Sequence, residues 1–312
     1  PRPSRYFRRS DQAARQLDDE SPPTEEIIIG TYAVTGSASG MGYQASGQLR
    51  GQGHTVIGVD LKDADVIADL STADGRRTAA ARVLELAEGK LDGAVLAAGI
   101  GPGAGPDRAR LIGQINYLGT VELLTAWRPA LAAAGNAKVV ALGSNSSTTV
   151  PAVPRRAIKA LLAGDADRAA RAVRFFGGGA SALMYAASKI AVARWVRQTA
   201  VTADWAGRGI RLNVLAPGAI MTPLLQAQLD SPREGKAVRA FPIPVGHFGD
   251  PVHLAEWITF MLSDSADFLC GSIIFVDGGT DAYFRPDSWP KGVPLRGIPQ
   301  YVWRHRRFSK TR

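Results

Sequence analysis

The chain has 312 residues, with 37 lysines and arginines against 28 acidic residues, and its net charge at pH 7 is +9. A single cysteine, Cys270, excludes a disulfide framework and a cysteine-rich metal site, and it indicates a reducing compartment, so we expect a cytoplasmic protein. No apolar run reaches the ~18 residues of a membrane span. We also expect no metal site, because no ligand spacing relates the four histidines, which are His54, His247, His253 and His305.

The excess positive charge lies mainly at the C-terminal end of the chain. Residues 285–312 carry eight basic side chains against one acid, Asp287, whereas residues 25–284 have a net charge of only +1. Residues 1–26 form a polar N-terminal extension that lacks the apolar stretch of a secretory signal. We therefore expect one nearly neutral domain, residues 27–284, between two extensions.

The basic C-terminal tail contains four prolines and shows no helical or strand period. Its aromatic residues are interleaved with arginines, a composition that would suit a nucleic acid or an acidic surface; they are Trp289, Tyr301, Trp303 and Phe308. Alternatively, the tail packs these rings on its own domain or on a neighbouring subunit. We favour the second interpretation and do not expect nucleic acid to be the partner.

Between the extensions, short apolar runs alternate with helical stretches. The pattern predicts strands at 31–35, 55–59, 93–97, 138–143, 210–215 and 272–276. It predicts helices at 41–52, 76–88, 107–134, 182–206 and 250–263. Apolar strands separated by amphipathic helices are typical of βαβ units. We therefore expect an α/β fold with a single doubly wound (Rossmann) domain, in which helices cover both faces of a parallel sheet.

A glycine-rich turn, TGSASGMG, follows the first predicted strand and opens a helix. Gly36, Gly40 and Gly42 allow a tight turn and a close approach of the backbone to a pyrophosphate. The helix N-terminus supplies N–H donors and the positive end of the helix dipole. The turn therefore predicts a dinucleotide site.

Asp60 closes the second predicted strand, about 20 residues beyond the glycines, where an acid accepts hydrogen bonds from the hydroxyls of the adenosine ribose. A carboxylate at this point would also repel a 2′-phosphate. Ser39 and Leu61, which would lie near that phosphate, are uncharged, and Lys62 is the only nearby cation. The sequence thus favours NAD over NADP.

Tyr185 and Lys189 are four residues apart on a predicted helix and therefore share one of its faces. A free tyrosine, with a pKa near 10, is a poor acid or base at neutral pH. A neighbouring cation favours the phenolate and lowers this pKa, as general acid–base catalysis requires. In isolation, the same pattern would indicate only a solvated pair on a helix surface.

Over about residues 30–280 the chain resembles the short-chain dehydrogenases/reductases. The motifs that carry the resemblance occur in that family's order; they are TGSASGMG, Asp60, Asn116 in NYLG, Ser144 at a strand end, YAASK, Pro217-Gly218 and Val276-Asp277-Gly278-Gly279. The resemblance implies that Tyr185 exchanges a proton with the substrate oxygen, while Lys189 lowers its pKa and holds the nicotinamide ribose. It further implies that Ser144 orients the substrate oxygen and that Asn116 anchors a water in a proton relay.

The resemblance also implies a set of residues around the cofactor. Asp69 matches the position that meets the adenine, and Gly99 lies in the loop beneath the cofactor. Thr222 would lie close to the nicotinamide carboxamide. The complete expected set is Gly36, Ser39, Gly40, Met41, Gly42, Asp60, Asp69, Leu70, Gly99, Tyr185, Lys189, Pro217, Gly218 and Thr222.

Two features depart from the usual family pattern. The family's Asn-Asn-Ala-Gly is replaced by Leu96-Ala97-Ala98-Gly99, so an asparagine that steadies the central sheet is missing, and we expect a local structural compensation. Ser144 and Tyr185 are also 41 positions apart, further than in most members. The additional segment, residues 148–181, predicts a helix near 156–175.

This insertion makes the chain similar to the bacterial 3α-hydroxysteroid dehydrogenase/carbonyl reductase subgroup, and also to bacterial coniferyl-alcohol dehydrogenases. It lies beside helices that many relatives use to pair subunits, so a homodimer joined partly through the inserted helix is expected. The alternative is an insertion that only covers the active site.

The resemblance implies an NAD-dependent oxidoreductase that interconverts a secondary alcohol and a ketone on a small apolar substrate. The stretch 219–248 would supply apolar contacts, although half of them suit an ordinary core; they are Met221, Leu224, Leu225, Leu229 and Phe241. Oxidation of a primary, coniferyl-type alcohol is the alternative. A non-catalytic nucleotide-binding scaffold is a remote alternative. A protein that no longer catalyses a reaction usually loses one of its catalytic residues, and here all four are present.

Overall fold

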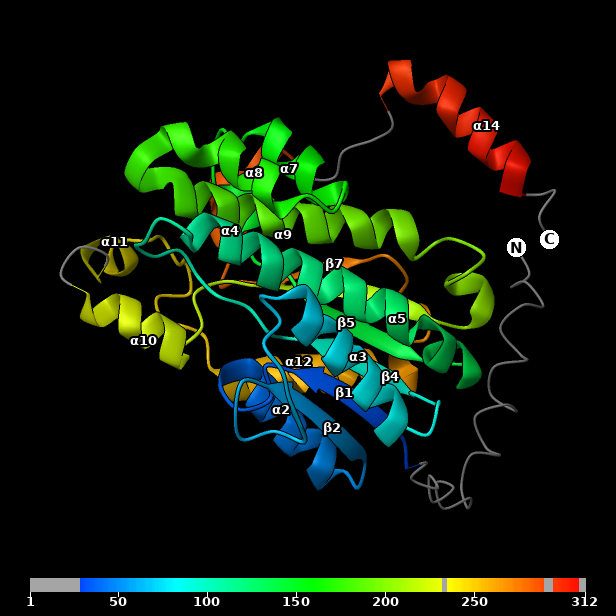
Figure 1. The fold of residues 1–312 in the computed structure, drawn as a ribbon. Coiled ribbons are helices and arrows are strands. Elements are labelled where there is room, and N and C mark those ends of the chain that lie inside the picture. The colour runs from blue at the N-terminus through cyan, green and yellow to red at the C-terminus, as the bar shows by residue number, and fades with distance from the viewer. Residues whose placement is uncertain (1–28, 232–234, 289–293, 309–312) are drawn as a thin grey trace, which may run out of the picture.

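The computed structural model describes residues 29–231, 235–288 and 294–308 (Figure 1), so the predicted N-terminal extension, residues 1–26, lies outside the described part. Seven parallel strands form one sheet in the order β3-β2-β1-β4-β5-β6-β7. They are β1 (Thr31–Thr35), β2 (Thr55–Asp60), β3 (Val66–Ile67), β4 (Gly93–Leu96), β5 (Lys138–Leu142), β6 (Arg211–Pro217) and β7 (Ile273–Val276). The doubly wound fold and all six predicted strands are confirmed, and the two-residue β3 is an addition.

The strand sequences are apolar because both faces of the sheet are covered. Every residue of β5 is buried, and four of the five residues of β1 are. Parallel sheets show such continuous burial when helices pack on both sides. The chain crosses from one side of the sheet to the other between β1 and β4, which pair from Tyr32↔Gly93 to Thr35↔Leu96. In doubly wound sheets this crossover is where ligands bind, at the carboxyl ends of the strands.

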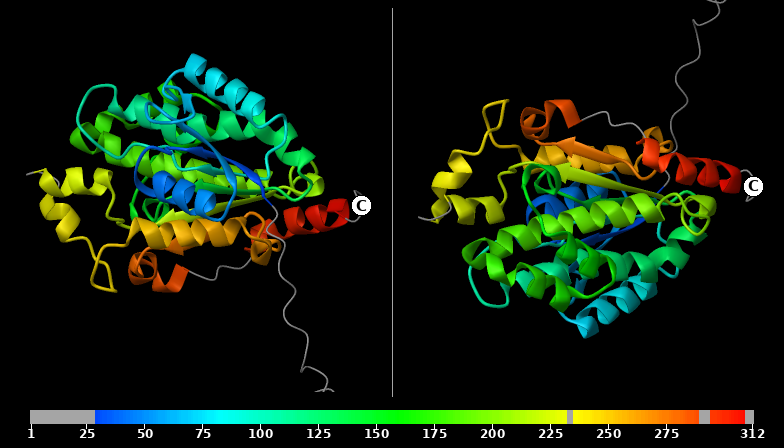
Figure 2. Two further views of the ribbon diagram at one scale, coloured as in Figure 1. Left: turned by 90° about the horizontal axis from the view of Figure 1, so that it is seen from below. Right: turned by 90° about the horizontal axis from the view of Figure 1, so that it is seen from above.

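Two helical layers enclose the sheet (Figure 2). One face carries α3 (Ala73–Leu86), α5 (Gly119–Ala133) and α9 (Ala180–Thr199), and the other carries α2 (Gly40–Gly51) and α12 (Pro251–Leu262). The helix predicted over 107–134 is not continuous. It consists of α4 (Arg108–Ile112), a π-helical segment η1 (Gly113–Leu118) and α5. The shorter helical segments are α6 (Ser146–Thr149), η2 (Arg174–Gly179), η3 (Ala206–Arg208), η4 (Asp264–Ala266), η5 (Pro286–Ser288) and η6 (Leu295–Gly297).

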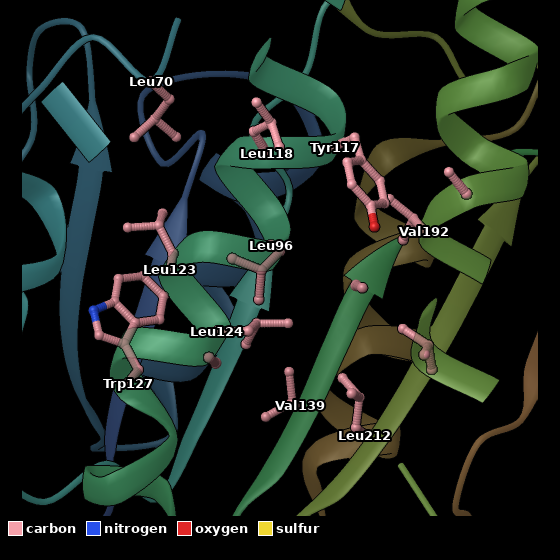
Figure 3. Close-up of a cluster of buried hydrophobic side chains, with 14 of the residues drawn as sticks. Leu70, Leu96, Tyr117, Leu118, Leu123, Leu124, Trp127, Val139, Val192 and Leu212 are labelled. Carbon is pink, nitrogen blue, oxygen red and sulfur yellow. The ribbon is translucent and has the colours of Figure 1, made fainter. Parts of the chain in front are cut away.

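The larger apolar core lies between the sheet and the α3–α5–α9 layer (Figure 3). Leu96, which stands where the family has asparagine, is 2% exposed and belongs to this core together with Leu123 and Leu124. Burying one such leucine contributes about 1.5–3 kcal/mol. The following loop is held by the Thr35 hydroxyl, which accepts a hydrogen bond from the Ala98 N–H at 3.1 Å. These two interactions steady the strand ends where the asparagine is missing.

The insertion forms two helices rather than the single one expected near 156–175. These are α7 (Arg155–Leu162) and α8 (Ala166–Val173), and they lie over α9 (Figure 1). Gly164 ends the first helix with a left-handed φ of 78°, and the Asp165 side chain caps the second by accepting from the Arg168 N–H at 2.7 Å. A C-terminal glycine followed by an N-cap aspartate separates two helices where the apolar pattern is continuous.

Four further helical segments end the chain or lie near its end: α10 (Pro223–Asp230), α11 (Gly235–Arg239), α13 (Thr280–Phe284) and α14 (Ile298–Phe308). The expectation that the C-terminal tail has no helical period is wrong for α14. Pro299 is compatible with the helix because it lies in the first turn, where a missing N–H is not needed. Tyr301 and Trp303 remain 57% and 54% exposed, so the expected packing of these rings on their own domain is not observed. Trp289 lies outside the described residues.

We predict that Arg76→Ala lowers the free energy of unfolding by about 2 kcal/mol. Arg76 is 5% exposed and donates from Nε to Glu122 at 2.7 Å and from Nη1 to the Leu70 carbonyl at 3.0 Å and Gln114 Oε1 at 2.9 Å. Its removal leaves these acceptors without a donor. Urea denaturation monitored by circular dichroism measures the loss.

The neighbouring Arg77→Ala is the matched control. Arg77 pairs with Asp74 on the same helix, but it is 71% exposed, so the loss of this surface pair should cost less than about 1 kcal/mol. Equal destabilisation by the two substitutions would contradict the structural role of Arg76.

Candidate active site

The glycine-rich turn joins β1 to α2 and is too crowded for side chains at two positions. A Cβ on Gly36, whose φ is 72°, would lie 2.8 Å from the Ala98 nitrogen. A Cβ on Gly42 would lie 2.2 Å from the Gly36 carbonyl oxygen. The turn therefore brings backbone close to the end of β4 and leaves the N-terminus of α2 directed toward the crossover of the sheet. This geometry is typical of a pyrophosphate site.

Asp60 holds this turn from the end of β2. Its carboxylate accepts hydrogen bonds from the Ala38 N–H at 3.0 Å and the Leu61 N–H at 2.7 Å. Each carboxylate oxygen retains a second lone pair for a further donor. The residue can therefore shape the turn and bind ribose hydroxyls at the same time.

A pocket of about 220 Å³ lies above the carboxyl ends of β1, β2 and β4. Most of the cofactor residues expected from the sequence line it, namely Gly36, Ser39, Gly40, Met41, Gly42, Asp60, Asp69, Leu70, Gly99 and Thr222. Sequence reasoning missed other lining residues, including Ile100, Ile115 and Leu224. The glycine cradle, the carboxylate and the apolar walls fit an adenine dinucleotide. Four expected residues, Tyr185, Lys189, Pro217 and Gly218, do not line this pocket.

Tyr185 and Lys189 lie four residues apart on α9, as expected. Ser144, just after β5, lies next to the Tyr185 side chain and lowers its pKa. Lys189 is 6% exposed and donates from Nζ to the Leu142 carbonyl at 2.8 Å; this nitrogen lies 5.7 Å from the centre of the Tyr185 ring. The structure thus brings Ser144, Tyr185 and Lys189 together from two elements.

The pKa values of Tyr185 and Lys189 are shifted in a way that the sequence did not predict. Burial raises the pKa of Tyr185, and the hydrogen bond from Ser144 lowers it only in part. Burial also lowers the pKa of Lys189 to about 8. Desolvation disfavours the charged form of each group and is the largest cause of both shifts. Tyr185 is therefore a neutral phenol at pH 7, the form that donates a proton.

Asn116 lies in the π-helical segment η1 and fixes the floor of the nucleotide pocket. Its Oδ1 accepts from the Ile100 N–H at 2.8 Å, and its Nδ2 donates to the Ile100 carbonyl at 2.9 Å. A Cβ on Gly99 would lie 3.3 Å from this Oδ1 and 3.9 Å from Lys189 Nζ. The glycine thereby lets the pocket floor rest directly on Asn116 and Lys189. Single π turns inside helices are frequent at functional sites.

The ends of β6 and β7 lie against each other. A Cβ on Gly218 would lie 2.7 Å from the Asp277 Cα, so this glycine allows the two strand ends to touch. Asp277 accepts hydrogen bonds from the Gly279 and Asp281 N–H groups at 3.1 and 2.7 Å, and from Asn145 Nδ2 at 3.4 Å. Sequence reasoning missed Asn145 as a positioning residue, although it directly follows Ser144.

Thr222, which follows β6, lies beside the glycine-rich turn. It caps α10 by accepting from the Leu225 N–H at 3.4 Å. A Cβ on Gly40 would lie 3.5 Å from the Thr222 methyl group. The start of α10 therefore packs over the turn and closes one side of the pocket.

A second, larger cavity of about 1080 Å³ is bounded by two of the segments that also line the nucleotide pocket, and its lining residues do not include Asn116, Ser144, Tyr185 or Lys189. The loop after β4 lines the first pocket at Ile100 and the second at Pro102, and α10 does so at Leu224 and Gln228. Ser181, which also lines the cavity, lies one helical turn before Tyr185 on α9. Sequence reasoning did not predict this cavity, because its walls come from segments far apart in the chain.

The described residues contain no group of three or more His, Cys, Asp or Glu side chains that could hold a metal ion. Within those same ranges, no helix has both the length and the apolar character needed to span a membrane.

Comparisons with known proteins agree with this geometry. A family model described as Enoyl-(Acyl carrier protein) reductase matches residues 168–281. The chain is 39% identical over 259 residues to a 3-alpha-hydroxysteroid dehydrogenase/carbonyl reductase from Comamonas testosteroni, an alignment that covers 82% of this chain and 98% of the relative.

The solved structures lead to the same family. A crystal structure of a 3-alpha-hydroxysteroid dehydrogenase from Pseudomonas sp. B-0831, complexed with NADH, matches with a TM-score of 0.78 and 44% identity over 83% of this chain and 100% of that one. An aldohexose dehydrogenase from Thermoplasma acidophilum shares the fold, with a TM-score of 0.64 at 20% identity over 86% of this chain and 98% of that one. The chain belongs to the short-chain dehydrogenase/reductase family and is an oxidoreductase acting on CH–OH groups.

Proposed function

We propose that this protein uses NAD to interconvert a secondary alcohol and a ketone on an apolar substrate, with 3α-hydroxysteroids as the substrate class. The observation that carries the proposal is the placement of Ser144 next to the Tyr185 side chain, beside the buried Lys189. The substrate class is supported by the two relatives, at 39% and 44% identity, that are named for 3α-hydroxysteroid dehydrogenase activity. The coniferyl-type alternative finds no support in either name.

NAD is the preferred cofactor in this proposal. Asp60 lines the nucleotide pocket together with Ser39 and Leu61, which are uncharged. A 2′-phosphate beside Asp60 would face a carboxylate, and no lysine or arginine among the described residues lines this pocket to offset the repulsion. The structural relative from Pseudomonas sp. B-0831 is a complex with NADH.

For ketone reduction, Tyr185 donates its phenolic proton to the carbonyl oxygen as the bond order of that carbonyl falls. NADH, held at the glycine-rich turn and Asp60, would supply the hydride that the carbonyl carbon receives, and NAD would take it up in the reverse direction. Ser144 holds the substrate oxygen against the phenol, and Lys189 stabilises the resulting phenolate by its positive charge. The reverse sequence oxidises the alcohol: the phenolate takes the hydroxyl proton.

Apolar substrate contacts are expected from the α10–α11 region. Met221, Leu224 and Phe241 are 39%, 43% and 37% exposed and are available to a substrate. Leu225 and Leu229 are each 8% exposed and belong to the packing of α10 itself. This division agrees with the expectation that only part of the apolar set would face a ligand.

We also propose that the protein is a homodimer and that it is located in the cytoplasm. The single cysteine, Cys270, supports a reducing compartment. The insertion packs its α7 and α8 helices against α9 and α4 and so covers part of the face through which many relatives pair, which supports an altered subunit contact. A non-catalytic scaffold is disfavoured because Asn116, Ser144, Tyr185 and Lys189 are all present.

We predict that Tyr185→Phe lowers kcat by about 10²–10⁴-fold with a 3α-hydroxysteroid and NAD. The phenylalanine ring preserves the packing but has no proton to exchange. Stopped-flow or steady-state absorbance of NADH at 340 nm measures the loss. NADH binding followed by fluorescence should remain near the wild-type affinity, and turnover near the wild-type rate would overturn the mechanism.

We predict that Asp60→Asn reduces the preference for NAD over NADP, measured as the ratio of kcat/KM values, roughly tenfold. The amide oxygen can still accept from the Ala38 N–H, but the repulsive charge is gone. Asp63→Asn removes an equal charge from the same loop at a side chain that is 79% exposed and outside the pocket lining. An unchanged ratio for Asp60→Asn, or an equal change for the control, would contradict the assignment.

We predict that the wild type gains stability relative to Lys189→Met as the pH rises from 8 to 10.5. Burial lowers the pKa of Lys189 from 10.5 to about 8, so in this window the unfolded chain binds a proton that the folded protein lacks. The gain in the free energy of unfolding is on the order of 3 kcal/mol.

Guanidinium denaturation of both proteins at pH 7, 8, 9 and 10 checks this prediction. Below pH 8 both states hold the proton, so the difference between the two proteins should be constant there. A difference that stays flat up to pH 10 would show that the Lys189 pKa is not depressed.

A further inference from the structure

The large cavity, whose lining includes Ser181 one helical turn before Tyr185, is lined in part by the insertion. Helix α8 and the segment after it contribute Arg171 and Arg174, and they face the α10–α11 helices and the loop after β4 across the cavity. The two arginines are three residues apart and therefore lie on one side of the helical turn. The insertion thus brings two guanidinium groups to a cavity that adjoins the reaction site.

These two arginines are not neutralised by the acids that line the same cavity. Asp167 pairs with Arg110 at 2.6 Å. Among the described residues, Arg171 has no hydrogen bond or ion pair, and Arg174 lies over the Phe175 ring at 4.7 Å, a contact that leaves its N–H donors free. Among the described residues, Asp107 is the one further acid in the lining. The cavity wall therefore carries a net positive charge.

The charge of the whole insertion has the same sign. Residues 148–181 contain six basic side chains and two acidic ones, within a body, residues 25–284, whose net charge is +1. A concentration of one sign of charge beside a cleft attracts ligands of the opposite sign. Two of the six basic side chains of the insertion, Arg171 and Arg174, line the large cavity.

The remaining lining is small and leaves room for an extended ligand. Glycine and alanine predominate along the loop after β4 and the segment before α9, including Gly103, Ala104, Gly177 and Gly178. A volume of about 1080 Å³ reaches the upper range of small-molecule sites, about 300–1,000 Å³. A substrate whose oxygen is at Tyr185 can extend from there toward the arginines.

We propose that Arg171 and Arg174 select substrates that carry a carboxylate at the end remote from the reacting hydroxyl. Arginine is suited to this role because its planar fork donates two parallel hydrogen bonds to a carboxylate. The proposal rests on the proposed function and deepens it: the substrate is an amphipathic hydroxysteroid with an anionic side chain. The arginines are specificity-determining residues and take no part in the proton transfer.

The test compares a 3α-hydroxysteroid that has a side-chain carboxylate with the methyl ester of the same compound. In the Arg171→Gln/Arg174→Gln double variant, we expect KM for the acid to rise at least about tenfold, with kcat nearly unchanged, while both constants for the ester stay near wild-type values. Unchanged turnover of the ester shows within the same experiment that the variant is folded. For the wild type, KM of the acid alone should rise with salt concentration.

The matched control is Arg156→Gln/Arg168→Gln, which removes the same charge from exposed positions of the insertion that do not line the cavity. It should leave KM for the acid within about twofold of the wild-type value. An equal effect of the two double variants would reduce the role of the arginines to general charge attraction and overturn the proposal. An equal change for acid and ester, or no change for either, would also overturn it. If the wild type oxidises neither compound, the proposed function itself fails.

Discussion

The hydrogen bond from Lys189 to the Leu142 carbonyl fixes helix α9 against the end of strand β5. Because Ser144 lies two residues after Leu142 and Tyr185 one helical turn before Lys189, this contact brings the serine hydroxyl and the phenol together. The same ammonium supports Gly99 in the floor of the nucleotide pocket. Burial of the Lys189 ammonium disfavours its charged form, as its lowered pKa shows. Such perturbed pKa values are common at sites where protons are transferred.

The insertion has to be accommodated without disturbing this contact. The insertion lies between Ser144 and Tyr185 in the chain and ends at the start of α9. Its two short helices bury Ile158, Leu161 and Val173 in the same core to which α9 contributes. Apolar side chains thus attach the insertion to the domain. Its basic side chains remain exposed, and two of them, Arg171 and Arg174, line the large cavity. The same segment therefore adds to the apolar core and places positive charge at this cavity.

Local sequence signals predicted the regular parts of the structure well and the irregular parts poorly. The six long strands, the glycine-rich turn and the Tyr185–Lys189 pair follow from short-range patterns. Strand β3 has two residues and no readable period, and the π turn at Asn116 is hidden inside a continuous helical pattern. The division of the insertion at Gly164-Asp165 was readable as a cap signal. Arg76 and Asn145 act through partners distant in the chain, so no local pattern could identify them.

The sequence by itself determined the fold class, the family, the nucleotide turn and the residue types of the catalytic set, because each depends on spacing along one strand, turn or helix. It also located the excess charge in the C-terminal segment. The tertiary structure alone decided that burial raises the pKa of Tyr185 and lowers that of Lys189, and that two arginines of the insertion line the large cavity. Burial and the joining of remote segments control these properties, and neither is a function of local spacing.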